Sequence, residues 1–299
     1  MARDPHSLPP VPLTTRIGRP EDLLAIAAWT RDTFSWGDYV ADAFLDWLAE
    51  EAGTVMIAEL DGIPVAMGRV AMVGPAQAWA QGMRVHPDHR RMGIGTALGE
   101  AMWEWARTRG ARIVRLAIDE RNTVSQAQVT ATGFRRISDW RRGERAIGDA
   151  SPVPAGNGGV RVPALERLDD APSAEAEPAF LSWSTGELAR AARGLLPIAW
   201  VWRTMTVDHL SLAARNHNLV EGRPGWAICE VDDDGVFQVH WLETTADDAR
   251  AMVLALVDRA VEADVAEMKV MVPAVEWLTD AFAGSGFEFN SVAVWARGL

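Results

Sequence analysis

The stretch VHPDHRRMGIGTAL, residues 85–98, decides how the first half of the chain is interpreted. It holds Arg90, Gly93 and Gly95 in the spacing R-x-x-G-x-G, between a strand-like segment and a helix expected over 95–109. Glycines let backbone approach a ligand closely, and the free N–H groups and dipole of a helix start favour an anion. The stretch therefore predicts a cradle for a phosphate-like group. A bare helix start is the alternative, because the motif alone is weak.

The segments around the cradle alternate between patterns typical of strands and of helices. The dipeptide Asp61-Gly62 separates two strand-like runs, which is a strong hairpin signal. Strands are expected over 14–18, 54–60, 63–73, 77–85, 113–118 and 135–145, and helices over 21–32, 39–51, 95–109 and 125–132. An antiparallel meander thus precedes a βαβ crossover. This order predicts an α/β (α+β) fold with a mixed sheet covered by helices.

Composition restricts the class of protein. The 299 residues are 48% hydrophobic and 23% charged, which suits one large or two modest globular domains. The sequence contains no apolar run long enough to span a bilayer, and no membrane partner is expected. Cys229 is the single cysteine, which excludes an internal disulfide and a cysteine-built metal site and favours the cytoplasm. A net charge of −12 argues against a nucleic-acid partner.

Charge is unevenly distributed along the chain. Residues 1–150 have 18 Arg and 19 acids, a net charge of −1, whereas 151–299 have 11 basic residues and 22 acids, a net charge of −11. Within the first half, residues 84–145 carry 13 Arg against 7 acids, a net charge of +6. Such a local excess suits a small anionic ligand, and a solvated basic face is the equally ranked alternative.

A segment rich in Gly and Pro, GDASPVPAGNGG at 148–159, is the expected linker. It separates a first domain over 12–147 from a second over 160–299. Residues 161–299 repeat the order of the first half, and Gly133-Phe134 and Gly286-Phe287 close equivalent βαβ units. Elements expected there are strands over 160–168, 226–231, 236–242, 267–272 and 288–296, and helices over 175–193, 207–218, 246–262 and 275–283.

These residues together resemble the GCN5-related N-acetyltransferase (GNAT) superfamily. The resemblance rests on VHPDHRRMGIGTAL, on Asn122 and on Gly133-Phe134, which follow one another at the spacing of that family. It covers about residues 12–146 and implies a co-substrate, acetyl-CoA, with no metal. The whole chain then resembles two tandem GNAT-like folds.

The resemblance implies a set of cofactor-binding residues. The amides of the cradle would hold the pyrophosphate, the preceding strand would bind the pantetheine arm, and Asn122 would contact the cofactor. The implied residues are Met83, Arg84, Val85, Arg90, Arg91, Met92, Gly93, Ile94, Gly95, Thr96 and Asn122. A backbone N–H near 83–85 would donate to the developing oxyanion.

The sequence departs from the family at its usual acid and base positions. These hold Trp79, Ala117 and Val129, none of which can transfer a proton. Either other groups or water perform this work, or catalysis has been lost. General acid–base catalysis contributes about 10²–10⁴-fold, so its absence slows the reaction without forbidding it.

Few residues remain as candidates on the acceptor side. Tyr39, the only tyrosine, is the candidate proton donor, and a packed phenol is the alternative. Asp38 would attract a substrate amine, unless it is a solvated helix-end acid. An apolar acceptor wall is predicted from aromatic residues that otherwise belong to the core: Phe34, Trp36 and Trp79.

The second half lacks the cradle. Its strand and helix are joined by LETTADDAR, in which Asp247 and Asp248 stabilise the helix start but repel a phosphate. We therefore expect a degenerate copy that does not bind acetyl-CoA.

Two functions are consistent with the sequence. The first is a cytoplasmic N-acetyltransferase in which a primary amine of a small molecule or peptide attacks the thioester directly. The second is a catalytically silent acyl-CoA-binding or scaffold protein. A longer acyl donor and the oligomeric state stay open, and the acidic second half mildly favours a cationic acceptor.

Overall fold

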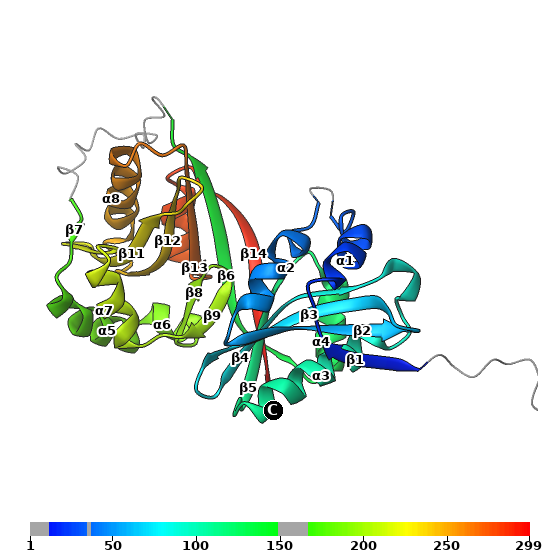
Figure 1. Cartoon of the computed structure of the whole chain (residues 1–299). Coiled ribbons are helices and arrows are strands. Elements are labelled where there is room, and N and C mark those ends of the chain that lie inside the picture. Colours follow the sequence, from blue (N-terminus) through cyan, green and yellow to red (C-terminus); the bar gives the residue numbers. More distant parts are fainter. Residues whose placement is uncertain (1–11, 35–36, 149–166) are drawn as a thin grey trace, which may run out of the picture. The chain divides into compact units, whose positions relative to one another are not determined.

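The computed structural model describes residues 12–34, 37–148 and 167–299. They form two compact units (Figure 1). The first comprises the chain up to Leu116 together with Ala296–Leu299, and the second comprises Ala117–Trp295. The expected linker lies outside the described residues, except for its first position.

The first unit is a sheet with helices on both faces. Its strands lie in the order β1-β2-β3-β4-β5, antiparallel except for the parallel pair β4–β5. Along the chain the elements are β1 (Leu13–Ile17), α1 (Asp22–Thr30), α2 (Val40–Ala49), β2 (Gly53–Leu60), β3 (Ile63–Gly74), β4 (Gln77–Val85), the 3-10 turn η1 (Pro87–His89), α3 (Ile94–Thr108) and β5 (Ile113–Asp119), of which the second unit takes the end. The order expected from the sequence is confirmed.

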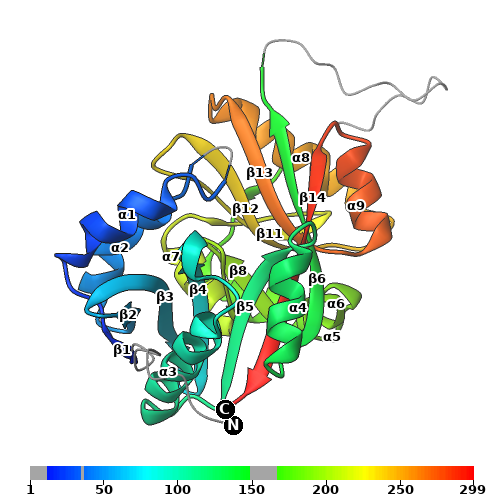
Figure 2. The ribbon, with the colours of Figure 1, turned by 90° about the vertical axis from the view of Figure 1, so that its right-hand side faces the viewer.

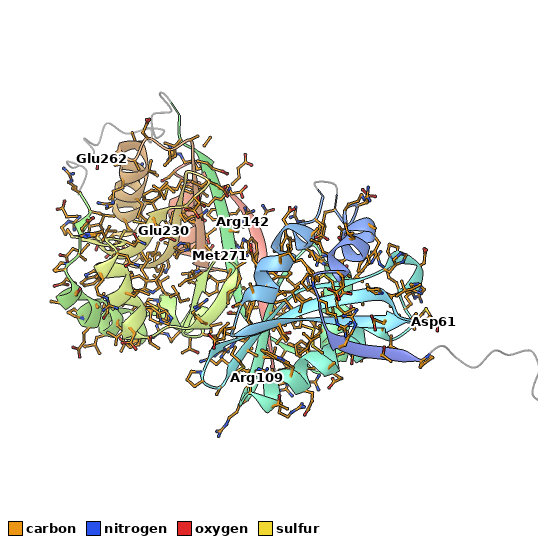
Figure 3. All side chains as sticks on the ribbon, viewed as in Figure 1. Asp61, Arg109, Arg142, Glu230, Glu262 and Met271 are labelled. Carbon is orange, nitrogen blue, oxygen red and sulfur yellow. The ribbon has the colours of Figure 1, made fainter. Side chains whose placement is uncertain are left out.

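The hairpin between β2 and β3 forms at the predicted dipeptide. Asp61 and Gly62 have φ of 51° and 76°, so both central residues adopt the left-handed conformation that a two-residue hairpin requires. Figure 3 labels Asp61 at the end of this hairpin.

Two glycines show which helix covers each face of this sheet. A Cβ on Gly68 of β3 would lie 2.8 Å from Met102 of α3, and a Cβ on Gly82 of β4 would lie 2.8 Å from Trp47 of α2. The face toward α1 and α2 is closed by a buried cluster of Ile26, Val40, Phe44, Trp47, Val55, Ile57 and Met67. Burial of this apolar surface is the main force that holds the layers together.

The second unit is built around a run of hydrogen-bonded strands. Its strands lie in the order β14-β6-β13-β12-β11-β10-β7, and β8 and β9 form a separate hairpin. Its elements are α4 (Thr123–Ala131), β6 (Arg135–Ala146), β7 (Asp169–Asp170), the 3-10 turn η2 (Ser173–Glu175), α5 (Ala176–Thr185), α6 (Glu187–Ala192), β8 (Leu195–Ile198), β9 (Val201–Thr204), α7 (Val207–Arg215), β10 (Leu219–Gly222), β11 (Gly225–Val231), β12 (Val236–Glu243), α8 (Ala249–Glu262), β13 (Glu267–Pro273), α9 (Glu276–Ala283) and β14 (Glu288–Gly298). Helices α8 and α9 pack on one another (Figure 2).

The two compact units do not coincide with the two halves of the sequence. Strand β6 belongs to the first half of the sequence but pairs with β13 over the register Glu267↔Ala146 to Pro273↔Trp140. The end of the chain returns to the first unit, where Leu299 N donates to Arg112 O at 3.0 Å. The expected domain limits, 12–147 and 160–299, therefore divide the chain differently from its compact units and stay a prediction.

Several elements of the second unit differ from expectation. The hairpin β8–β9 and strand β10 were not predicted, and the helix expected over 175–193 is broken into α5 and α6 at Gly186. The β8–β9 turn places Ala199 and Trp200 at φ of 47° and 63°. Neither residue is a usual turn signal, so local sequence patterns do not predict this turn. The strand expected over 160–168 lies almost wholly outside the described residues.

Candidate functional site

The predicted cradle is a tight turn between η1 and α3. Arg91 has φ of 65° and Gly93 has φ of 81°, so two residues of the turn adopt the left-handed conformation. Gly93 is the N-cap of α3, and the helix begins at Ile94, one residue before the expected start. Gly93 meets the conformational requirement at little cost, because glycine has no Cβ.

The turn presents a row of backbone N–H groups. The first backbone hydrogen bond of α3 runs from Ala97 N to Gly93 O at 3.0 Å. Among the described residues, no acceptor is found for the N–H groups of residues 91–96. Unpaired donors at a helix start, reinforced by the helix dipole, form an anion-binding site.

Two guanidinium groups add charge at this turn. Arg90 and Arg91 are both exposed, and Arg90 Nε donates to Val85 O at 3.3 Å. No ion pair of either arginine is found within the part of the chain that the structure describes. Their charges are therefore available to a phosphate group, which arginine binds with charge-assisted hydrogen bonds.

Strand β4 contains a bulge just before the cradle. Arg69 of β3 pairs with Gln81 and Met67 pairs with Arg84, so Gly82 and Met83 oppose the single residue Gly68. Gly82 has φ of 67°, which is the left-handed conformation that such a bulge favours. A bulge re-aims the backbone groups that follow it, and here those belong to residues 83–85.

The pairing of β4 with β5 ends before this bulge. The parallel pairs run from Gln77↔Ile113 to Trp79↔Arg115, while β4 continues to Val85. A strand that continues beyond its last registered pair can direct backbone N–H and C=O groups toward an extended ligand. The predicted strand residues Met83, Arg84 and Val85 lie on this stretch, next to the cradle in the chain.

The predicted acceptor residues Phe34, Asp38 and Tyr39 gather around Arg84. Arg84 Nε and Nη2 donate to Asp38 Oδ2 and Oδ1 at 2.7 and 3.0 Å. The same guanidinium lies 5.1 Å from the ring centre of Phe34 and 5.5 Å from that of Tyr39. The Asp38 side chain is fully buried, so its charge serves Arg84. Its expected attraction for a substrate amine stays a prediction that this pairing disfavours.

Tyr39 caps the start of α2 and is 41% exposed. Burial of its environment raises the pKa of the Tyr39 phenol, and the positive charge of Arg84 opposes this effect. A phenol is protonated at neutral pH even at its ordinary pKa of about 10, so Tyr39 holds the proton that a donor requires. The role of Tyr39 as a proton donor stays a prediction.

Trp79 is only 1% exposed and donates from Nε1 to Gln81 Oε1 at 2.8 Å. It is therefore a core residue in this conformation, and its place in an acceptor wall stays a prediction that its burial disfavours. Trp36 lies outside the described residues.

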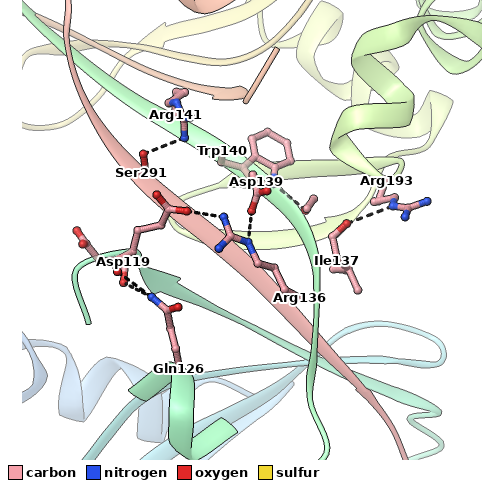
Figure 4. A network of polar contacts seen from close by, with 11 residues as sticks. Asp119, Gln126, Arg136, Ile137, Asp139, Trp140, Arg141, Arg193 and Ser291 are labelled. Carbon is pink, nitrogen blue, oxygen red and sulfur yellow. Dashed lines mark hydrogen bonds and ion pairs between the residues drawn. The ribbon is translucent and has the colours of Figure 1, made fainter. Parts of the chain in front are cut away.

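Asn122 lies in the second unit, where it caps α4 by accepting from Ser125 N at 3.1 Å. The carboxylates before it are engaged. Asp119 pairs with Arg121 at 2.8 Å, and Glu120 pairs with Arg136. Arg136 also binds Asp139, as Figure 4 shows. The Arg121 hydrogen bond lowers the pKa of Asp119, and the Arg136 hydrogen bond lowers that of Glu120. Both carboxylates are thus held ionised.

The corresponding loop of the second half differs from the cradle. Asp248 is the N-cap of α8 in an ordinary right-handed conformation, and its N–H donates to Thr245 Oγ1 at 3.2 Å. Arg223 pairs with the Asp248 carboxylate at 3.2 Å. The loop therefore satisfies its own polar groups and places a carboxylate at the helix start.

Two arginines of the first unit, Arg69 and Arg115, belong to no recognisable sequence motif. Each lies inside an otherwise apolar strand, and a charged residue in that setting is the signal that could have revealed them. Among the described residues, no group of three or more His, Cys, Asp or Glu side chains could hold a metal ion. Nor does any helix among them have the length and apolar character to cross a membrane.

Known proteins resemble both the cradle region and the fold. Residues 23–134 match the model of the acetyltransferase (GNAT) family. A 49-residue stretch is 49% identical to the acetyl transferase GW6a of Oryza sativa subsp. japonica, and it spans 16% of this chain and 12% of that protein.

Solved structures resemble nearly the whole chain. A GCN5-related N-acetyltransferase from Sphaerobacter thermophilus superposes with a TM-score of 0.68 at 17% identity, over 98% of this chain and 97% of that one. A tandem GNAT protein from the clavulanic acid biosynthesis pathway gives a TM-score of 0.58 at 16% identity, over 96% and 98% of the two chains. At such identities the likeness shows the fold. Residues 23–134 thus match the acetyltransferase (GNAT) family, and the chain has the fold of tandem GNAT proteins.

Proposed function

We propose that this protein transfers the acetyl group of acetyl-CoA to a primary amine of a small molecule or peptide, by direct attack of the amine on the thioester. The observation that carries the proposal is the row of N–H groups over residues 91–96 for which no acceptor is found among the described residues. This row leads into α3, and the exposed side chains of Arg90 and Arg91 lie at its beginning. The cytoplasmic location favoured by the cysteine content is part of this proposal.

The residues present suit acetyl-CoA. The diphosphate needs several donors and positive charge, which the cradle amides, Arg90 and Arg91 supply. The pantetheine arm carries amide groups, which suit the strand edge at Met83–Val85. The second half has no equivalent of this arrangement at Asp248, so we propose one binding site per chain and a structural role for the degenerate copy.

Acetyl-CoA, when bound, supplies an activated acetyl carbonyl and a sulfur leaving group. The chain's own residues bind and orient: the cradle fixes the diphosphate, and the edge of β4 aligns the arm. A backbone N–H that the bulge re-aims would donate to the carbonyl oxygen as its charge grows. The C–N bond forms as the C–S bond breaks, the amine loses a proton to water, and Tyr39 donates one to the sulfur.

Thiol release from acetyl-CoA, measured over amino acids, polyamines, aminoglycosides and peptide N-termini, tests the activity. We expect saturable turnover of at least one class of amine. The variant Tyr39→Phe should lower kcat by about 10²-fold or more if the phenol donates the proton, and unchanged kcat would dismiss that role.

A catalytically silent acyl-CoA-binding protein is the second candidate. It is favoured by Trp79, Ala117 and Val129 at the usual acid and base positions, and by the pairing of Asp119 and Glu120 with arginines. Saturable binding of CoA without turnover of any amine would decide for it. A binding series of longer acyl-CoA esters would reveal a preference for another donor.

A further inference from the structure

The face of strands β3, β4 and β5 toward α2 holds an excess of partly buried positive charge. Arg69 pairs with Gln81 across β3 and β4, and Arg115 pairs with Trp79 across β4 and β5. Paired residues on neighbouring strands share a face, so both arginines lie on the side of the sheet that Gly82 presents to Trp47. The row spans three strands and ends where β4 continues beyond its last registered pair with β5.

The carboxylates available do not balance these arginines. Arg69 binds Glu50 through Nε and Nη2, and Arg84 binds Asp38. Within the described residues no carboxylate contacts Arg115, whose Nη1 donates to the neutral Gln77 Oε1 at 2.6 Å. Burial lowers the pKa of Arg115, and no neighbouring negative charge offsets that effect. Three guanidinium groups therefore face two carboxylates.

Arg69, although paired with Glu50, and the uncompensated Arg115 each carry an orphaned donor. The Arg69 side chain is 7% exposed, and its Nη1 is buried without a hydrogen-bond partner among the described residues. The Nε of Arg115 is likewise buried without a partner there. Buried donors are normally satisfied, so two of them in one row indicate a missing acceptor. An isolated buried charge is costly unless a counter-charge joins it.

The place of Arg115 in the sheet indicates which molecule would carry the hydrogen-bond acceptor. Arg115 lies in the last registered pair of β4 with β5, at the base of the stretch where β4 offers its edge to the thioester. An anionic group bound there would belong to the molecule whose amine attacks. The diphosphate has its own donors in the cradle.

We propose that the acceptor is an amine that also carries a carboxylate, such as an amino acid, and that Arg115, supported by Arg69, binds this carboxylate. This inference rests on the proposed acetyltransferase function. It replaces the cationic acceptor that the acidic second half mildly favours, because Asp38 is already neutralised by Arg84 and the uncompensated charge on this face is positive.

The test compares matched acceptors and variants. The twenty amino acids and their α-amides are assayed for thiol release from acetyl-CoA, with wild type, Arg115→Gln, Arg115→Lys and Arg112→Gln. Arg112 is exposed and lies before the same strand, so it is the matched control. We expect at least one free acid to exceed its amide about 100-fold or more in kcat/KM. Arg115→Gln should abolish that preference, Arg115→Lys should keep part of it, and Arg112→Gln should keep it all.

Equal rates for acids and amides, or a preference unchanged in Arg115→Gln, would overturn the inference and leave the acetyltransferase function intact. Absence of turnover with every amine would instead count against that function. The carboxylate site is then judged by calorimetry with N-acetyl amino acids and their amides. Binding of an acid that is lost in Arg115→Gln supports the site, and no binding of any acid overturns it. Circular dichroism and CoA affinity establish that each variant is folded.

Discussion

At the scale of single residues, Gly82 shows how one backbone conformation shapes the site. Its φ of 67° permits the bulge in β4, and its missing side chain leaves room for the buried indole of Trp47. We predict that Gly82→Ala lowers the free energy of unfolding by about 2–4 kcal/mol, from left-handed strain plus overpacking.

Denaturant unfolding measures this loss, and Gly62→Ala is the matched control. Gly62 has φ of 76°, and a Cβ there meets no heavy atom within 4 Å among the described residues. Its variant therefore suffers strain alone and should lose about 1–2 kcal/mol. Equal losses at the two positions would show that the contact with Trp47 is unimportant.

The pair Asp38–Arg84 fixes the segment before α2 to the cofactor strand. Because the Asp38 side chain is fully buried, Asp38→Asn leaves the Arg84 charge without its partner. We predict a loss of about 3–5 kcal/mol in the free energy of unfolding. The double variant Asp38→Asn, Arg84→Gln should lose less than the single one, and additive losses in this mutant cycle would contradict the pairing.

At the scale of elements, the sequence predicted what local patterns determine. The bounds expected for β4, 77–85, are those observed, and the β2–β3 hairpin forms at Asp61-Gly62. In contrast, the bulge at Gly82 depends on the register between β3 and β4, and the β8–β9 turn depends on packing that holds Ala199 and Trp200 in left-handed conformations. Such features arise from tertiary contacts, which override local propensity.

The candidate site likewise has parts that neighbouring residues determine and parts that tertiary contacts determine. The cradle could be predicted because a motif of neighbouring residues builds it. The pairing of Asp38 with Arg84 joins residues 46 positions apart, and the row of Arg69 and Arg115 joins three strands. No pattern of neighbouring residues encodes these arrangements, so the sequence predicts a substrate contact for Asp38 and no role for the two arginines.

The end of β12 holds a carboxyl group whose titration affects stability. Glu243 is 9% exposed and accepts from Ser182 Oγ at 2.9 Å, and burial raises its pKa. Between the unfolded and the folded pKa the native state therefore binds more protons, so the stability contributed by this group is lost as pH rises. We predict that Glu243→Gln, which cannot ionise, gains stability relative to wild type as pH increases from about 4 to 7.

Denaturant unfolding at a series of pH values checks this trend. A stability difference between Glu243→Gln and wild type that stays constant with pH would contradict the assignment.

At the scale of the whole molecule, the exchange of strands makes the sequence halves interdependent. Strand β13 pairs with β6, and Leu299 bonds to Arg112 in the first unit. We predict that residues 1–147 and 160–299, expressed separately, each fail to show a cooperative unfolding transition, because each lacks a strand or tail that its unit requires. Co-expression of the two pieces should restore a stable complex. Cooperative, monomeric unfolding of either piece alone would contradict this account.

The central claim is that the amides of residues 91–96 bind the diphosphate of coenzyme A, and calorimetric titration of CoA tests it most directly. Gly93→Asp places a carboxylate in the cradle, whereas Gly62→Asp makes the same change at another open position with positive φ. We predict one CoA bound per chain for wild type and Gly62→Asp, and no detectable heat for Gly93→Asp. Wild type that takes up no CoA, or Gly93→Asp that binds it with unchanged affinity, would contradict the claim.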